Sequence, residues 1–529
     1  MASARGDRPP PAPRRRLAIS TAIFAIATAL SRVAGLVREI VAASYFGTSR
    51  YASAFTIASQ IPNLMSNLFA QAALSAAFVP VFTDLLQQGR KREAFRLAST
   101  LFWIILLALG ALTAVGMLLA GVVLPSFTGR DFAGSVAATL TQVMFPVVLI
   151  LGLTGLLVGI LQSYDEFSIP ALAPVAWNLV ILVLLIALHS RVHPSIEAYA
   201  IAWLIATFVQ LLMVGWALGR IDFRLRFEVD WRDPRIRQVF TLMLPVTIGL
   251  GIVNLDALIN SSLGALVNAQ GPRAIQFAFL IYMLPQGIFS VAVSTVLFPT
   301  LSRQAARRAP SQMRHTLGNG MRQILLLLIP AAAGLMVLTT PITRLVFQHG
   351  HFGAYSTHLT SIALFWFAVS LPFAGLNLLL TRTFFALQRP WIPTRLAALN
   401  MIVDMIVSLA LYKPLGIAGL VIGTGAANVV MTALQLRRLR TGFNGRLEGG
   451  QTLMITVRIA LAAALTAAIA RGVWAIVDSV LGLSIAGQLV SVGLAVVIGA
   501  AVYAWLTLTM RIPEARQIER LVRDRLRPA

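Results

Sequence analysis

Two arginines lie inside the first membrane-length apolar segment of the chain. They are Arg32 and Arg38, in the sequence Ser-Arg-Val-Ala-Gly-Leu-Val-Arg. A charged side chain in the hydrocarbon region is costly unless it faces water or a partner, so an intramembrane arginine marks a functional site by default. The planar guanidinium group can donate two parallel hydrogen bonds to a phosphate group. The pair therefore predicts a membrane protein that binds an anionic, phosphate-bearing substrate.

The spacing of the two arginines decides whether they act from one helix face. Arg38 follows Arg32 by six residues, which is about 9 Å along an α-helix and places the two on different faces of a straight one. Gly35 lies between them and allows bending or close packing. Glu39 shares the face of Arg32, so we expect it to neutralise this binding site in part. The alternatives are a structural ion pair and, for Arg38, a side chain that extends to the outer membrane interface.

A second group of polar residues in later apolar segments is acidic. Asp256 lies in one of these segments together with Asn260. Asn400 and Asp404 lie in another and are four residues apart, so they share a helix face. Thr424 follows in the next segment. Carboxylate, amide and hydroxyl oxygens suit a hard cation, which predicts a Na⁺ or proton site that couples an ion gradient to transport. The alternative is a set of interhelical hydrogen bonds with one carboxyl group protonated.

The motifs of the common enzyme classes are absent from the sequence. The chain has no cysteine, and it contains no P-loop, no G-x-G-x-x-G that opens a helix and no G-x-S-x-G. A thiolate nucleophile and a cysteine-ligated metal are therefore excluded. We expect no enzyme activity, and without a nucleotide-binding module any active transport must be secondary.

The composition predicts the elements that must position these residues. Of 529 residues, 58% are hydrophobic and only 12% are charged. Apolar runs of about 20 residues, each long enough to cross a bilayer, recur along the chain. We therefore expect an all-α polytopic membrane protein with about fourteen transmembrane helices. Their expected limits are 17–46, 53–86, 95–124, 135–162, 170–189, 196–219, 236–262, 273–302, 320–340, 356–386, 393–412, 416–436, 454–478 and 484–510.

The distribution of basic residues predicts the orientation in the membrane. The net charge is +24, and most loop arginines fall in every second loop, as the positive-inside rule requires of cytoplasmic segments. This pattern places both termini in the cytoplasm, as the basic tails 1–16 and 511–529. It implies anionic membrane lipids as neighbours and does not point to nucleic acid.

Prolines suggest a weak internal repeat. Pro62 and Pro285 lie in segments six spans apart, and so do Pro170 and Pro393. A shift of six spans keeps the orientation of each helix, which predicts two parallel six-helix lobes related by an axis along the membrane normal. The expected lobes are 17–219 and 220–440, followed by two further helices in 454–510.

Several motifs of this chain together resemble the MurJ/MviN family of lipid II flippases, within the MOP exporter superfamily. They occur in the family's order between about residue 20 and residue 440. The matching stretches are Ser31–Glu39 with Tyr45-Phe46-Gly47, Ile61–Leu64, Ala77–Pro80, Phe167–Pro174 with Asn178, Val346–Phe352 and Phe384–Pro393.

The resemblance implies a MOP/MATE-like fold with a central cationic cavity and a groove for the lipid tail at the last two helices. It implies that an undecaprenyl-diphosphate-linked peptidoglycan precursor is moved from the inner to the outer leaflet of a bacterial cell membrane by alternating access. Arg32 and Arg38 match the family's first-helix arginines, beside Glu39, and would hold the diphosphate. Asp256, Asn400, Asp404 and Thr424 are similar to the oxygen ligands of a Na⁺ site in some members. Cell-wall synthesis proteins are the partners that such a role implies.

The chain also departs from the family pattern. Ser66 stands where the family has a cavity arginine, and Phe279 and Leu280 stand where it has an acidic residue followed by an arginine. Two of the four arginines expected to hold the substrate are thus missing. Three alternatives follow: a flippase for another polyprenyl-diphosphate-linked sugar, a MATE-like antiporter, and a membrane scaffold for cell-wall enzymes that transports nothing. A scaffold should tolerate the loss of Arg32, whereas a flippase should not.

Overall fold

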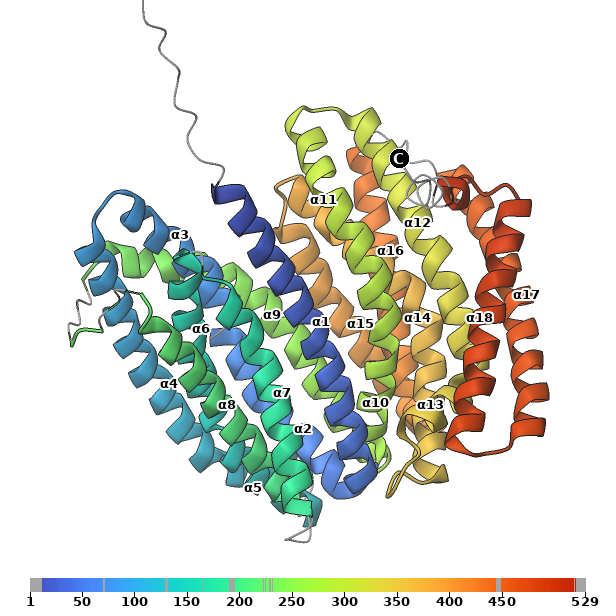
Figure 1. The fold of residues 1–529 in the computed structure, drawn as a ribbon, viewed down its shortest axis with the longest axis horizontal. Helices are drawn as coiled ribbons and strands as arrows, with labels where there is room; N and C mark the ends of the chain where they lie inside the picture. Colours follow the sequence, from blue (N-terminus) through green and yellow to red (C-terminus); the bar gives the residue numbers. More distant parts are fainter. Residues whose placement is uncertain are drawn as a thin grey trace, which may run out of the picture. The chain divides into compact units, whose positions relative to one another are not determined.

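The computed structural model describes residues 12–69, 72–128, 132–164, 166–189, 196–221, 223, 225–227, 230, 232–443, 449–517 and 519. Within these ranges every regular element is helical (Figure 1). Among the described residues, eleven helices are long and apolar enough to cross a membrane. The prediction of an all-α polytopic membrane protein is therefore confirmed, whereas the number fourteen stays a prediction.

The described residues of the first half of the chain form nine helices. They are α1 (Ala12–Phe46), α2 (Arg50–Phe69), α3 (Ala72–Gln87), α4 (Lys91–Thr128), α5 (Phe132–Met144), α6 (Pro146–Ser163), α7 (Ser168–His189), α8 (Ile196–Leu218) and α9 (Pro234–Val267).

In the second half, the described residues form nine α-helices and one short π-helical segment. They are α10 (Gly271–Pro285), η1 (Gln286–Ser290), α11 (Val291–Ala306), α12 (Pro310–Val337), α13 (Thr339–Phe347), α14 (Ala354–Ala386), α15 (Trp391–Leu415), α16 (Ile417–Gly442), α17 (Gly449–Leu481) and α18 (Ile485–Thr509).

The expected span 273–302 differs from the structure at a proline, because η1 interrupts it directly after Pro285. The expected span 53–86 covers α2 and α3, and residues 70 and 71 between them lie outside the described residues. Proline has no N–H to donate and crowds the preceding turn, and a π-helical turn is one way for a helix to accommodate this. The helices α1, α2, α3 and α9 are not among the eleven candidate spans.

The helices form two compact units. One holds the described residues up to Tyr45 and from Ile57 to Asn254, and the other holds Phe46–Thr56 and the described residues from Leu255 onward. The expected lobes 17–219 and 220–440 stay a prediction, because the division into compact units falls within α9 and gives α17 and α18 to the second unit.

The short segment Phe46–Thr56 is bound into the second unit by polar side chains. The hydroxyl of Thr48 donates a hydrogen bond to Gln270 Oε1 over 2.6 Å and lies 2.7 Å from the hydroxyl of Ser356. Thr56 donates to Gln276 Oε1 over 2.8 Å. The turn between α1 and α2 is therefore held by residues more than two hundred positions later in the chain.

The core of the first unit is built by α3, α4 and α6. Phe78, Phe82, Leu101 and Ile160 are completely buried there, and the two phenylalanine rings pack with centroids 4.9 Å apart. Burying large apolar side chains against one another holds these helices together at close-packed density.

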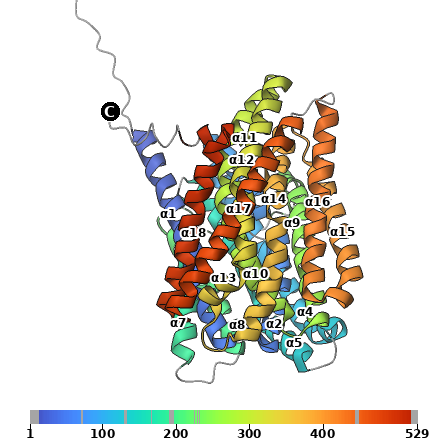
Figure 2. The ribbon, with the colours of Figure 1, turned by 90° about the vertical axis from the view of Figure 1, so that its right-hand side faces the viewer.

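In the second unit α12 packs against both α14 and α17, and α17 packs against α18. Figure 1 and Figure 2 both show α17 and α18 side by side next to α12. Of the predicted basic tails, residues 1–11, 518 and 520–529 lie outside the described residues. Residues 513–517 are helical, and Glu514 forms a buried ion pair with Arg322 of α12.

Candidate functional site

Arg38 lies in a polar and aromatic enclosure within the first unit. Its Nη1 donates a hydrogen bond of 3.0 Å to Asn178 Oδ1, and its Nη2 pairs with Glu39 Oε1 at 2.6 Å. The guanidinium carbon lies 4.8 Å from the ring centre of Trp177 and 5.5 Å from that of Trp203. Only 11% of the Arg38 side chain is exposed. A buried arginine is thus paired, hydrogen-bonded and stacked at once, and we name these five residues the arginine enclosure.

Helix α7 positions the enclosure against α1. The amide nitrogen of Asn178 donates to the Pro174 carbonyl over 2.9 Å and reaches the Ser31 carbonyl at 3.4 Å. A Cβ at Gly35 would touch Asn178 Oδ1 at 3.5 Å. Helix α1 continues unbroken through Gly35, and the contact at 3.5 Å is an ordinary van der Waals distance, so α7 packs directly on α1 at this position.

Arg32 has a different environment from Arg38. Its side chain is exposed, and no described residue forms a hydrogen bond or an ion pair with it. An ion pair joins Glu39 to Arg38 and not to Arg32, whose helix face it was expected to share. The partial neutralisation of the arginine site by Glu39 stays a prediction. Glu39 is buried. The guanidinium group that pairs with it belongs to the preceding residue, Arg38, which also donates a hydrogen bond to Asn178.

A carboxyl cluster lies within the second unit. Asp404 is only 1% exposed and accepts three side-chain hydrogen bonds. They come from Asn260 Nδ2 at 2.8 Å, Ser408 Oγ at 2.9 Å and Thr424 Oγ1 at 3.1 Å. All three donors are neutral, so they solvate the carboxylate without balancing its charge.

Two further oxygen groups complete the carboxyl cluster. The carboxyl group of Asp256 lies beside that of Asp404. Asn400 Oδ1 is buried, and no group in the described part of the chain donates a hydrogen bond to it. A Cβ at Gly423 would lie 2.7 Å from Asp404 Oδ1. A side chain at this position would therefore displace the carboxylate.

The cluster brings together the sequence-predicted residues Asp256, Asp404 and Thr424, with Asn400 on the same helix as Asp404. Two adjacent carboxyl groups need a proton or a cation between them, and the uncoordinated oxygen of Asn400 is the donor type that a hard cation prefers. Among the described residues no group of three His, Asp or Glu side chains could hold a metal. A Na⁺ ion here would thus rely on amide and hydroxyl oxygens as well as carboxylates, and the donor set fits this ion.

Ser408 is a member of the cluster that the sequence analysis missed. It follows Asp404 by four residues and continues the face that begins at Asn400. Extending the row by one more step could have found it. Its hydroxyl also lies 3.3 Å from the Leu420 carbonyl, which links α15 to α16.

An apolar groove of about 530 Å³ runs along α12, α17 and α18. It is lined by small and aliphatic residues such as Leu326, Pro330 and Gly334 of α12 and Ala467 of α17. Tyr503 of α18 also lines it, and its hydroxyl donates a hydrogen bond of 2.7 Å to the Leu326 carbonyl. Because the tyrosine's polar group is satisfied, the groove offers a surface that suits hydrocarbon.

The positions that depart from the expected pattern are apolar in the structure as well. Phe279 packs with its ring 5.7 Å from that of Phe367, and Leu280 follows it on α10. The side chain of Ser66 lies outside the described residues. The buried Arg273 donates to Gln276 Oε1 over 2.7 Å, and Arg322 is paired with Glu514. Both arginines therefore serve contacts within the fold.

The fold defines a class of protein. A solved structure titled "Lipid II flippase MurJ, inward closed conformation" matches with a TM-score of 0.77 at 22% identity, over 92% of this chain and 98% of that one. A multidrug resistance MATE family transporter of the MOP superfamily in an inward-facing conformation matches with a TM-score of 0.69 at 15% identity, over 78% and 94% of the two chains. The chain therefore has the fold of a MOP-superfamily membrane transporter.

The sequence comparisons identify the family. The family model "Lipid II flippase MurJ" matches residues 42–512. The lipid II flippase MurJ of Burkholderia cenocepacia is 30% identical over 424 residues, which are 78% of this chain and 82% of that protein. The probable lipid II flippase MurJ of Vibrio cholerae is 27% identical over 438 residues, 80% and 83% of the two chains. This chain belongs to the MurJ family. Arg32 and Arg38 precede the residues that the family model matches.

Proposed function

We propose that this chain is a lipid II flippase, which moves the lipid-linked peptidoglycan precursor from the inner to the outer leaflet. The observation that carries this proposal is the similarity to a lipid II flippase MurJ over about four fifths of both chains. The protein is a transporter and not an enzyme, and it works by alternating access. A MATE-like antiporter is disfavoured, because the sequence matches MurJ proteins even though the fold alone is shared with MATE transporters.

The two first-helix arginines would bind the diphosphate in different ways. Arg32 is exposed and unpaired among the described residues, so it is the group that can meet a phosphate without breaking an existing contact. Arg38 must first be released from Glu39. The diphosphate would compete with Glu39 for Arg38, and this exchange of partners would change the packing between α1 and α7.

The carboxyl cluster would supply the coupling to an ion gradient. Asp256, Asp404, Asn400 and Thr424 would hold Na⁺, whose charge would neutralise the two carboxyl groups when bound. With a proton as the coupling ion, the same neutralisation would come from protonation of one carboxyl group. In either case α9, α15 and α16 are drawn together when the charge is balanced and separate when it is not.

The role of a flippase also requires a binding surface for the hydrocarbon tail of the lipid. The apolar groove along α12, α17 and α18 would take the prenyl chain.

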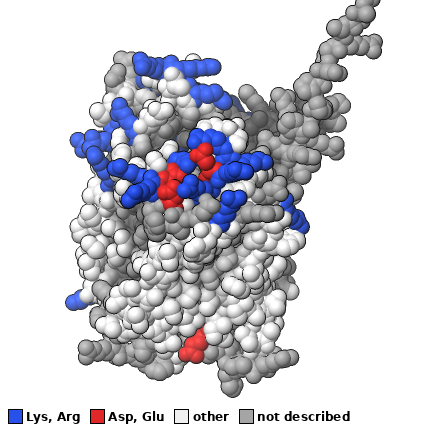
Figure 3. Space-filling model, turned by 90° about the vertical axis from the view of Figure 1, so that its left-hand side faces the viewer, with Lys and Arg blue, Asp and Glu red and all other residues white. Residues whose placement is uncertain are grey.

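The protein would lie in the inner membrane with both termini in the cytoplasm, and proteins that build the cell wall would receive the flipped lipid. Ion pairs at the predicted inner loops support this orientation, because charged side chains gather on the predicted cytoplasmic side. Arg235 pairs with Glu93 at 2.8 Å, and Arg96 pairs with Asp230 at 3.3 Å. Figure 3 shows such charged side chains gathered above a wide area almost without charge.

Complementation tests the proposal. Cells depleted of their own lipid II flippase would receive the parent chain, Arg32→Ala, Arg38→Ala, or the control Arg458→Ala, which removes an exposed arginine from α17, at matched membrane expression. We expect rescue by the parent and the control, and loss of rescue with Arg32→Ala. Full rescue by Arg32→Ala would overturn the role of this arginine.

A second candidate function concerns the head group. The apolar residues Phe279 and Leu280 stand where the family carries charge, which favours a different sugar on the same polyprenyl diphosphate. A well-inserted parent chain that fails to rescue, yet co-purifies with another polyprenyl-diphosphate-linked sugar, would support this second candidate over lipid II.

A further inference from the structure

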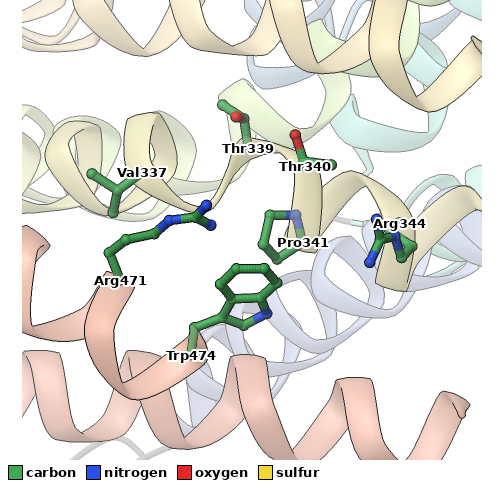
Figure 4. Close-up of a pocket in the computed structure, with 7 residues that line it drawn as sticks. All are labelled: Val337, Thr339, Thr340, Pro341, Arg344, Arg471 and Trp474. Atoms are coloured by element: carbon green, nitrogen blue, oxygen red, sulfur yellow. The ribbon is translucent and has the colours of Figure 1, made fainter. Parts of the chain in front are cut away.

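The apolar groove ends at a small polar pocket. The pocket has a volume of about 370 Å³, and Figure 4 shows its lining. Arg471 and Trp474 of α17 face the end of α12 and the first turns of α13 across it. The lining residues are Val337, Thr339, Thr340, Pro341, Arg344, Arg471 and Trp474.

The pocket carries positive charge that the fold does not balance. The side chain of Arg344 makes no hydrogen bond or ion pair with any described residue. Arg471 stacks over the ring of Trp474, with its guanidinium carbon 4.4 Å from the ring centre, and no acidic side chain in the described ranges pairs with it. Stacking fixes the plane of the guanidinium group and leaves its N–H donors available. Two arginines without acidic partners on one pocket indicate a site for an anion.

The first turn of α13 adds neutral donors on the same side. Thr339 and Thr340 open this nine-residue helix, and no side chain caps its N-terminus. The first backbone N–H groups of a helix have no partner within it, and the helix dipole favours a negative group there. Hydroxyl groups, backbone N–H groups and two guanidinium groups together are the donors that phosphate oxygens require.

The pocket is continuous with the groove along two helices. On α17 the groove residue Ala470 immediately precedes Arg471, and on the other side Leu338 immediately precedes Thr339. Leu338 and Ala470 belong to one buried cluster, against which Trp474 packs. From Leu326 to Leu338 the groove extends about 18 Å. A hydrocarbon chain in the groove would therefore bring a charged end group to the two arginines.

We propose that this pocket binds the phosphate group of a lipid whose hydrocarbon chain lies in the apolar groove. The ligand class is a prenyl phosphate, and the site is separate from Arg32 and Arg38 and from the carboxyl cluster. The proposal rests on the proposed function only for the prenyl nature of the chain. The phosphate follows from the residues of the pocket.

Binding to the purified full-length chain tests the proposal. Native mass spectrometry would count the molecules of geranylgeranyl phosphate bound per chain, with geranylgeraniol as the tail without phosphate and inorganic phosphate as the phosphate without tail. The variants are Arg344→Gln with Arg471→Gln, and Arg458→Gln as a matched control on the same helix. Because a hydrogen bond to a charged group contributes about 1.5–3 kcal/mol, we expect the double variant to lose one bound molecule and weaken binding at least about tenfold.

Three results would overturn the proposal. They are equal binding by the parent and the double variant, binding of geranylgeraniol as tight as that of its phosphate, and binding of inorganic phosphate as tight as that of the lipid. If the double variant does not fold, Arg471→Lys is the alternative. It keeps the positive charge but loses the planar guanidinium group that stacks on Trp474, and we expect binding between that of the parent and complete loss. A parent chain that binds geranylgeranyl phosphate but fails in complementation would count against the flippase role and leave this site standing.

Discussion

The arginine enclosure of the first unit and the carboxyl cluster of the second unit treat buried charge in opposite ways. In the enclosure, the charge of Arg38 is balanced by Glu39 and further shielded by two tryptophan rings. In the cluster, Asp404 accepts hydrogen bonds only from neutral groups, and its neighbour Asp256 adds a second acid. The charge of the enclosure is balanced within the fold, although the buried Arg38 Nε has no hydrogen-bond partner among the described residues. Two adjacent carboxyl groups, by contrast, need a cation or a proton. We therefore expect the enclosure to serve the packing of the first unit and the cluster to depend on an ion.

The largest effect is expected from Asp404→Ala. It leaves the buried donors of Asn260, Ser408 and Thr424 without an acceptor, which should lower the free energy of unfolding by about 4 kcal/mol. Thermal unfolding of the purified protein would measure this. Asp404→Asn is the matched variant, because it keeps the volume but removes the charge. It should fold better than Asp404→Ala and lose any stabilisation by Na⁺. A Na⁺-dependent unfolding temperature that survives in Asp404→Asn would contradict the assignment of ion dependence to the cluster.

Glu39→Gln should cost about 3 kcal/mol, because it leaves a buried arginine without its counter-charge. The comparison predicts that this loss is largely recovered in the double variant Glu39→Gln with Arg38→Met, since a neutral, apolar pair no longer has a charge to balance. A double-variant cycle on thermal unfolding measures both values. A double variant less stable than Glu39→Gln alone would show that Arg38 stabilises the enclosure through contacts other than its ion pair with Glu39.

Gly423→Ala should cost about 2 kcal/mol by overpacking the carboxyl cluster. The added Cβ would overlap Ser408 Oγ and approach Asp404 Oδ1 to 2.7 Å. Gly425→Ala, two residues further along α16, is the control, because its Cβ would meet Ser370 Cβ at an ordinary 3.5 Å. Equal unfolding temperatures for the two alanine variants would show that the cluster is loosely packed.

The smallest effect is expected at the ion pairs of Arg235, whose side chain is about a quarter exposed, and these pairs serve as a reference for both buried sites. Burial alone would raise the pKa of Asp233, but the hydrogen bonds donated by Arg235 outweigh it, and the pKa is lowered. A carboxyl group with a lowered pKa in the folded state stabilises the protein above its ordinary pKa, and this stabilisation is lost as the pH falls through the lowered value. Arg235→Gln should remove less than about 1 kcal/mol at neutral pH. It should also flatten the decline in unfolding temperature between about pH 5 and pH 3. An unchanged acid profile in Arg235→Gln would contradict this.

The sequence predicted the helical membrane fold well, because apolar runs of bilayer length leave few alternatives to a helix. Helix spacing placed Asn400 and Asp404 on one face, whereas Asp256 and Thr424, in other segments, were grouped with them only by residue type and by the resemblance to the family. The sequence could not predict that Glu39 pairs with Arg38, because the position of the Arg38 guanidinium depends on its hydrogen bond to Asn178 of α7. Nor could it find the pocket of Arg344 and Arg471, since these residues are far apart in the chain and only the packing of α17 against α12 brings them together.

The attachment of Phe46–Thr56 to the second unit has a consequence for how the chain is made. Thr48 leaves the ribosome 222 residues before its hydrogen-bond partner Gln270. At about 5–20 residues per second, the turn between the first two helices waits for roughly ten seconds or more before its partner is synthesised. During translation the first unit can gather its helices, but this one turn stays unfinished. Completion of the second unit is therefore the event that closes the first hairpin of the chain.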